Sequence, residues 1–237
     1  MFGVTNLASG LTAAAVDSRP RKQIIIKGDT HIDYNENHYT DQYGSIFYDG
    51  DGDGLEIIGG DDFNLDGEYT IEMWFRLTDT DRPQMIITNR AGSGYAPGDF
   101  YIQFNADVNK IQWGINGNPT KFSDQRINKE EWIHLAIVRN STNLQLYLHG
   151  SPHGDLIATG PENDINSDSS NGKIFTGLLG SGLDLKGHMA EIRISTVARY
   201  FDSVDEIEPI FTNDKDTVLL IHGAGSLGED IILDDNR

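Results

Sequence analysis

Short runs in which apolar and polar residues alternate follow one another along most of the chain. In residues 69–77 apolar side chains recur at every second position, and Glu72 and Arg76 fall between them. This two-residue period is typical of a half-buried β-strand. It returns in three further segments, at residues 100–104, 144–148 and 192–194. Residues 133–138 are apolar on both faces, which indicates a strand in the middle of a sheet.

Clusters of Gly, Asn and Asp separate these runs. They lie at residues 50–54, 91–98, 116–119, 140–143 and 163–172, and such residues tolerate the backbone angles of tight turns. After residue 41 no segment keeps an apolar 3.6-residue period for three turns, and residues 197–205 form a short helix at most. Many short strands joined by polar turns predict an all-β sandwich or barrel.

Length and charge narrow the class of protein. The chain has 237 residues, no cysteine and a net charge of −19, a size that suits one sandwich domain able to fold without disulfide or metal. The acidic surplus argues against a nucleic-acid partner, because phosphate contacts need clustered Lys and Arg. No apolar run approaches the roughly 20 residues of a membrane span. We also expect no signal peptide, since no basic start precedes an apolar stretch.

Residues 1–40 differ from the rest of the chain. Residues 1–16 are small and apolar and show no strand or helix period. Residues 1–27 carry a net charge of +3, against −22 for the remainder, and their bases are Arg19, Arg21, Lys22 and Lys27. Such asymmetry is typical of an interaction arm, although a disordered tail has the same composition. We predict an extended N-terminal assembly arm at residues 1–40 and a folded domain at 41–237.

One acidic turn is a candidate metal site. Asp49, Asp51 and Asp53, with Gly54, match the first half of a D-x-D-x-D-G calcium loop, which places oxygen ligands around one ion. Gly60 stands where the loop needs a bidentate Glu. We take the three aspartates as candidate Ca²⁺ ligands, and a solvated glycine-rich hairpin as the alternative.

Five segments occur in a fixed order along the chain. They read FYDGDGDGLEI (47–57), YTIEMWF (69–75), EWIHLAIVR (131–139), NLQLYLHG (143–150) and GHMAEIRIS (187–195). Together they resemble the motifs of laminin-G-like domains of the concanavalin A type, over residues 46 to about 200. The resemblance implies a jelly-roll β-sandwich of two antiparallel sheets.

Two segments indicate a more specific group of laminin-G-like domains. RISTVARY (193–200) and DTVLLIH (216–222) are similar to laminin-G-like domains in tailed-phage, cyanophage-like structural proteins. This implies a virion protein of the tail or fibre, displayed on the particle surface and adhering to host-surface carbohydrate. We expect a homo-oligomer that contacts other virion proteins through the arm, and we expect residues 216–222 to pair with the strand near residue 46. The alternative is a purely structural capsid-decoration or connector protein that uses the sandwich for docking.

The resemblance also implies a calcium site. Domains of this type often bind calcium through one Asp in each of two motifs. The first corresponds to Asp49, but the second position is Ala190, and the loss of a charged ligand weakens affinity. Asp61, Asp62 or Glu191 could take its place.

Enzyme motifs are absent from the sequence. No E-x-D-x-x-E strand of the β-glucanases occurs, and there is no cysteine and no G-x-S-x-G elbow. Among the seven histidines only His149 and His153 stand at H-x-x-x-H spacing, where a hairpin turn explains them, and no H-E-x-x-H motif occurs. We therefore predict a protein that is not an enzyme.

A sugar site needs an exposed aromatic face beside planar polar groups. Four residues lie in or next to glycine-rich loops and are our candidates for carbohydrate binding: Tyr95, Tyr101, Trp113 and Asn116. For each aromatic residue, packing in the core or at a sheet edge is the alternative. Trp74 and Trp132 stand at strand positions that are typical of the core.

Overall fold

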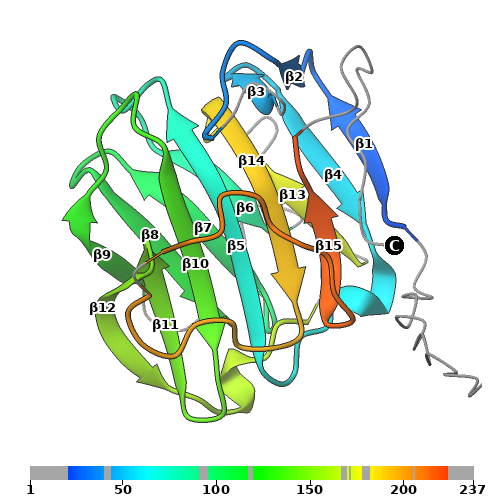
Figure 1. The fold of residues 1–237 in the computed structure, drawn as a ribbon, viewed down its shortest axis with the longest axis vertical. Helices are drawn as coiled ribbons and strands as arrows, with labels where there is room; N and C mark the ends of the chain where they lie inside the picture. The colour runs from blue at the N-terminus through cyan, green and yellow to red at the C-terminus, as the bar shows by residue number, and fades with distance from the viewer. Residues whose placement is uncertain are drawn as a thin grey trace, which may run out of the picture.

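Two antiparallel sheets packed face to face make up the fold in a computed structural model of the chain (Figure 1). The structure describes residues 21–39, 44–90, 96–116, 120–166, 170, 172–177, 182–204 and 206–223. The predicted all-β sandwich is confirmed.

The first sheet has seven strands. Their order is β1 (Gln23–Lys27), β4 (Gly54–Ile58), β13 (Lys173–Thr176), β6 (Gln84–Thr88), β7 (Phe100–Asn105), β8 (Lys110–Ile115) and β9 (Lys121–Arg126). A single 3₁₀ turn, η1 (Gly60–Phe63), follows β4, and a second, η2 (Pro161–Asn163), precedes β13. Within the part of the chain that the structure describes, these turns are too short and too polar to cross a membrane.

The second sheet has eight strands. Their order is β12 (Ser151–Ala158), β11 (Asn143–Leu148), β10 (Ile133–Arg139), β5 (Tyr69–Leu77), β14 (Lys186–Ser195), β3 (Ser45–Asp49) and β2 (His31–Asp33), with β15 (Thr217–Ile221) paired to β14. The predicted pairing of residues 216–222 with the strand near residue 46 is wrong. β15 instead pairs with residues 192–195, beyond the part of β14 that pairs with β3.

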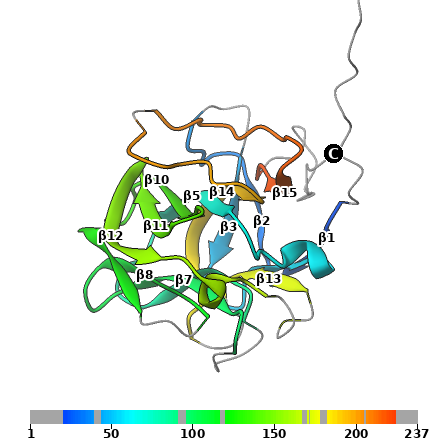
Figure 2. The same cartoon turned by 90° about the horizontal axis from the view of Figure 1, so that it is seen from below.

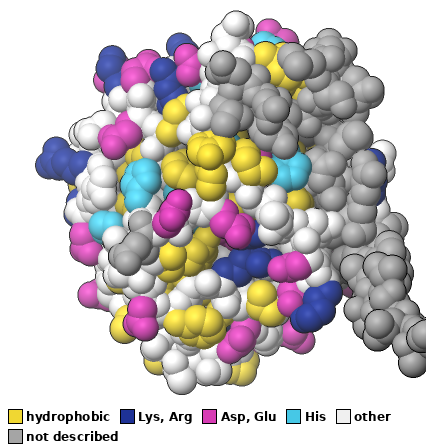
Figure 3. Space-filling model, in the orientation of Figure 1, with side chains coloured by type: hydrophobic (Ala, Val, Ile, Leu, Met, Phe, Trp, Pro, Cys, Tyr) yellow, Lys and Arg dark blue, Asp and Glu magenta, His cyan; other side chains and the backbone are white. Residues whose placement is uncertain are grey.

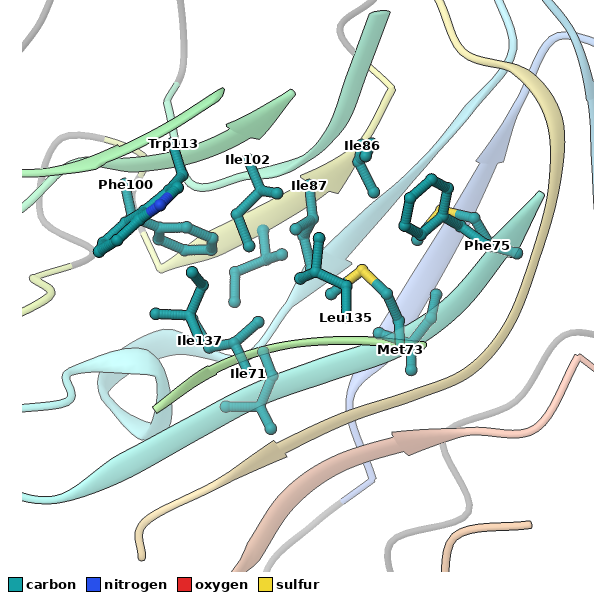
Figure 4. Packing of buried hydrophobic residues seen from close by; sticks show 14 of the residues in the cluster. Ile71, Met73, Phe75, Ile86, Ile87, Phe100, Ile102, Trp113, Leu135 and Ile137 are labelled. Atoms are coloured by element: carbon teal, nitrogen blue, oxygen red, sulfur yellow. The ribbon is translucent and has the colours of Figure 1, made fainter. Parts of the chain in front are cut away.

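The inward faces of the two sheets form the main core. The alternation predicted for residues 69–77 is confirmed, because the apolar positions of β5 are fully buried against the opposite sheet. Figure 4 shows Met73 and Phe75 of β5 and Leu135 of β10 packed against Ile87 of β6. Burying each such side chain contributes about 1.5–3 kcal/mol, so this layer supplies most of the driving force for folding.

The outer face of the eight-stranded sheet is covered in part by residues 196–204 and 206–216, which we call the covering segment. It crosses β10, β5 and β14 in Figure 1, and Figure 2 shows it on the side away from the seven-stranded sheet. Ala198 and Tyr200 of this segment form a second apolar cluster with Tyr147 and its neighbours in the sheet. The sheet is therefore buried on both faces beneath the segment.

The predicted boundary of the N-terminal arm at residue 40 is wrong. β1 pairs with β4 and β2 pairs with β3, so the folded unit begins ahead of residue 41. Lys22 forms an ion pair with Asp62, and Lys27 lies 3.2 Å from a Glu56 carboxylate oxygen. These two bases serve the sandwich itself, since their partners belong to it.

The remaining bases of the predicted arm are Arg19 and Arg21. Arg21 is exposed just before β1, and Arg19 lies outside the described residues. An arm ahead of β1 therefore stays a prediction.

Candidate binding site

Trp113 does not offer a face to a sugar. It is 1% exposed and occupies an inward position of β8, between the inward-facing Ile111 and Ile115. Figure 4 shows its ring beside Phe100 in the core. The prediction of an exposed tryptophan here is wrong. The two-residue period of β8 carries the signal that would have placed Trp113 inside, since a residue between two inward isoleucines at i−2 and i+2 shares their face.

Tyr101 and Asn116 hold the loops at one end of the sandwich together. Tyr101 is 3% exposed, and its hydroxyl lies 2.9 Å from Thr120 Oγ1. Asn116 adopts a positive φ of 52° and accepts a hydrogen bond from the Gly98 amide at 2.8 Å. Burial removes the Tyr101 ring from contact with a ligand, so that prediction is also wrong. Tyr95 lies outside the described residues.

The acidic turn brings together a different set of aspartates from the predicted one. Carboxylate oxygens of Asp29, Asp49 and Asp53 lie within 4.8 Å of one another. Asp51 is exposed and outside this group, although its amide donates to the Asp49 carboxylate at 2.7 Å. Asp29 joins the group because β1 pairs with β4, which sets Lys27 opposite Gly54. No local pattern around residue 29 could have shown this.

Asp53 organises the acidic turn. The side chain is buried, and its two carboxylate oxygens accept the amides of Asp29 at 2.8 Å and Asp49 at 2.7 Å. Burial raises the pKa of Asp53, and the nearby Asp49 charge adds to this. Because both carboxylate oxygens of Asp53 already hold the turn, a cation here would rely mainly on Asp29 and Asp49.

The proposed substitutes for the missing family ligand lie elsewhere. Ala190 is fully buried in β14. Glu191 accepts hydrogen bonds from the Phe211 amide at 2.7 Å and lies 2.8 Å from His222 Nδ1. Asp62 pairs with Lys22. The residues present fit a cation only in part. Asp29, Asp49 and Asp53 supply three carboxylates, whereas Ca²⁺ binds six to eight oxygen atoms.

A buried carboxylate anchors the covering segment. Glu72, predicted to point outward, does so but is fully buried beneath the segment. It accepts hydrogen bonds from Arg193 Nε at 2.7 Å and from the Tyr200 hydroxyl at 2.6 Å, and His134 Nε2 lies 3.4 Å away. Burial alone would raise its pKa, but the His134 contact and the Arg193 charge outweigh burial and lower the pKa of Glu72.

The other contacts of the covering segment run along its length. The Thr70 hydroxyl donates to the Val197 carbonyl at 2.8 Å and accepts the Arg199 amide at 3.0 Å. The Arg193 guanidinium lies over the Phe211 ring, 4.3 Å from its centroid. A β-bulge in β14 between Ala190 and Arg193 sets Arg193 opposite Glu72. The segment is thus fixed on the sheet by side chains of β5 and β14.

A groove of about 530 Å³ lies where the covering segment meets the β11–β12 hairpin. Its lining residues are Gln145, Tyr147, Pro152, Gly154, Leu156, Phe201, Asp202 and Ser203. The volume falls within the range of small-ligand sites. The Val204 amide donates to the Gly150 carbonyl at 2.9 Å, and the Tyr147 and Tyr200 rings lie 5.8 Å apart. These contacts hold the two walls of the groove at a fixed separation.

The groove combines exposed apolar surface with polar groups. Phe201 and Leu156 are each 63% exposed, the highest values among the large hydrophobic residues that the structure describes. Asp202 and Ser203 follow Phe201 on the same wall. Burial raises the pKa of Tyr147, and the charge of Asp202 adds to the effect. Such a lining suits an amphipathic ligand with one apolar face and several hydroxyls.

Aromatic and histidine side chains occupy the part of the outer face that the covering segment leaves open. Trp74 and Trp132 are half-buried there rather than in the core. The His38 ring stacks on Trp74 with centroids 5.2 Å apart and lies 5.7 Å from Trp132. Figure 3 shows hydrophobic side chains gathered on this face with histidines on both sides. His38 therefore covers part of the Trp74 ring, whereas Phe201 in the groove is 63% exposed.

Burial controls the protonation of several histidines on this face. It lowers the pKa of His38, His149 and His188. His134 adds to the effect at His149, and Arg76 adds to it at His188. These rings are therefore held in the neutral form further into the acidic range than free histidine.

A family model described as the concanavalin A-like lectin/glucanases superfamily matches residues 49–205. The match begins at the end of β3 and continues beyond β14, so it includes most strands of both sheets. No curated protein matches the sequence.

Solved structures share the fold at low identity. A candidate carbohydrate-binding protein from Bacteroides ovatus ATCC 8483 aligns with 91% of this chain and 56% of its own, at 12% identity and a TM-score of 0.55. The binding domain of botulinum neurotoxin DC, in complex with SialylT, aligns with 75% and 43%, at 11% identity and a TM-score of 0.54. A Trypanosoma rangeli sialidase in complex with 2,3-difluorosialic acid aligns with 65% and 26%, at 10% identity and a TM-score of 0.50. The chain spans about half or less of the length of these structures.

Replacing Glu72 by Gln should destabilise the fold by about 3–5 kcal/mol at pH 7, because the buried Arg193 loses its counter-charge. Since the folded-state pKa of Glu72 is lowered, its contribution is complete above the unfolded value of about 4.3 and is lost as pH falls through the folded value. Urea unfolding at neutral and acid pH should show the difference from wild type shrinking in acid. Glu131→Gln, at an exposed position, is the control, and an equally small effect of both changes would contradict this role.

Stability should also fall as pH drops below about 6.5, the pKa of histidine in the unfolded chain. With lowered folded-state values, the unfolded chain takes up protons before the folded one does, so histidine contributes stability at neutral pH that is lost in acid. Urea unfolding between neutral pH and mild acid measures the slope. His188→Gln should reduce it, whereas His31→Gln, at an exposed position, should not. A wild-type curve that is flat over this range would rule out the effect.

Proposed function

This chain belongs to the concanavalin A-like lectin/glucanases superfamily, and on that premise we propose that it is a non-enzymatic carbohydrate-binding protein. The observation that carries the proposal is the groove beside the covering segment. It presents the exposed Phe201 ring next to Asp202 and Ser203. An aromatic ring packs against the apolar face of a sugar while carboxylate and hydroxyl groups bind its hydroxyls.

Two structural neighbours support sugar binding at the level of fold. The protein from Bacteroides ovatus is a candidate carbohydrate-binding protein, and the neurotoxin binding domain is in complex with SialylT. Fold alone does not fix the ligand. The proposal therefore takes the ligand class from the side chains of the groove.

The same groove supports a role without catalysis. Glycoside hydrolases use a pair of carboxylates that flank the scissile bond. Among the described residues that line the groove, the one carboxylate is Asp202. The similarity to the sialidase is at 10% identity, which speaks for the fold and not for an active site.

We place this binding function on a tailed-phage particle, where the protein would adhere to host-surface glycan from the tail or fibre. Sequence similarity supports this location. The two segments that carry this similarity are residues 193–200 and 216–222, and they lie side by side in the fold. Residues 193–200 end β14 and begin the covering segment, and β15 pairs with β14. A homo-oligomer would turn a shallow groove into a multivalent surface. Imaging of intact particles separates this from a connector role, in which the groove would be buried against neighbouring proteins.

Calcium binding at the acidic turn is part of the proposal, with Asp29 and Asp49 as the main ligands. For a site as weak as those of extracellular calcium modules, about 10 mM CaCl₂ should raise the free energy of unfolding by about 1–3 kcal/mol. Chemical denaturation with and without calcium measures this. Asp49→Asn should abolish the gain, and Asp51→Asn, outside the carboxylate group, should keep it. Equal curves for wild type with and without calcium would remove the metal from the proposal.

Replacing Phe201 by Ala should weaken glycan binding about two- to ten-fold, because one stacked ring is worth about 0.5–1.5 kcal/mol. A glycan array identifies the ligand, and titration calorimetry on the best neutral oligosaccharide measures the change. The control is Tyr39→Ala, which removes an equally exposed aromatic side chain outside the groove lining.

Wild-type stability is expected in both variants, since each ring is mostly exposed. If Phe201→Ala binds the oligosaccharide as tightly as wild type does, the groove is not the sugar site. An array without any bound glycan would remove the lectin function itself.

A further inference from the structure

A second hollow adjoins the groove across strand β12. Its volume is about 300 Å³, and it lies between β9 and β12. Gly154 of β12 lines both hollows. Phe122 of β9 lines the second one and is 39% exposed. Each hollow therefore has a partly exposed aromatic ring, and the two meet at one residue.

Gly154 lies in close contact with strand β9. It adopts a positive φ of 73°, and a Cβ atom there would lie 2.7 Å from the Phe122 carbonyl oxygen. The Gly154 amide also donates to the Asp124 carboxylate at 2.7 Å. The contact with β9 therefore requires glycine at the residue that the two hollows share.

Charges in the second hollow largely cancel. The two lining bases, Lys110 and Lys121, balance the two lining acids, Asp124 and Asp155, and Lys121 Nζ lies 3.7 Å from an Asp155 carboxylate oxygen. Thr120 and Ser123 add uncharged hydroxyls. Opposite charges across β9 and β12 leave a mixed polar lining without a single dominant sign. Such a lining suits a neutral ligand rich in hydroxyl groups better than a polyanion, which the net charge of −19 would repel.

We infer that the two hollows are subsites of one cleft that binds a neutral oligosaccharide chain across Gly154, with Phe201 and Phe122 as the ring platforms. The inference rests on the proposed sugar-binding function and adds the ligand class, a chain of several units instead of one terminal sugar. A chain of rings with alternating apolar and hydroxyl faces can contact both platforms at once. One short sugar can occupy only one hollow.

Affinity should therefore depend on chain length. Titration calorimetry with neutral β-glucan, α-glucan and N-acetylglucosamine series of increasing length, from the monomer upward, tests this on the full chain. We expect a rise of about two- to ten-fold once both subsites are filled, followed by a plateau, since the second stacked ring adds about 0.5–1.5 kcal/mol.

Two substitutions assign the subsites. Phe122→Ala should lower the affinity for long chains about two- to ten-fold and return it to the short-chain value, while short chains bind as before. Phe201→Ala should weaken both long and short chains. Val108→Ala is the control, because Val108 is also 39% exposed but lines neither hollow. Thermal unfolding confirms that each variant keeps the fold.

The outcomes separate this inference from the function on which it rests. Binding that is independent of length, together with a silent Phe122→Ala, overturns the two-subsite cleft and leaves the sugar site at the groove intact. Length dependence that Phe122→Ala does not change overturns the role of the second hollow. Failure of every series to bind overturns the sugar-binding function and the cleft together.

Discussion

The buried carboxylate of Glu72 is the constraint on which the rest of the arrangement depends. A charge enclosed within a protein destabilises the fold unless it is paired and hydrogen-bonded. Arg193 and Tyr200 meet this requirement, one from the adjacent strand β14 and one from the covering segment. Tyr200 can reach Glu72 only if the covering segment lies across the sheet. The covering segment forms a third layer on this sandwich, and one acidic side chain in the central strand β5 therefore holds it in place.

The position of the candidate site depends on this contact between Glu72 and the covering segment. The segment that satisfies Glu72 with Tyr200 also provides Phe201, Asp202 and Ser203 as a wall of the groove. The other wall is the β11–β12 hairpin, which Val204 contacts through the carbonyl of Gly150. A binding surface built in this way does not need a mobile loop, because one wall belongs to the sheet and the other is fixed by a buried charge.

Sequence periodicity predicted much of this fold, whereas the candidate sugar-binding residues were chosen from loop composition. Residues 69–77 were expected as a strand, and β5 has those bounds. The same period, applied to Trp113 and Trp74, would have placed the first inside and the second outside, as observed. The choice of candidate sugar-binding residues relied on loop composition instead of this two-residue period. Asp29 and the groove could not be predicted locally, because each depends on pairing between distant segments.

Tyr200 and Phe201 are consecutive residues with very different surroundings. Tyr200 is 8% exposed and bound to Glu72, whereas Phe201 is 63% exposed in the groove. The two side chains thus have opposite surroundings, one against the sheet and one toward solvent. Changes at position 201 should then alter ligand contacts at little cost in stability, since its ring contributes little buried area. A scaffold of this kind can vary its ligand while Glu72 and Tyr200 keep the wall in place.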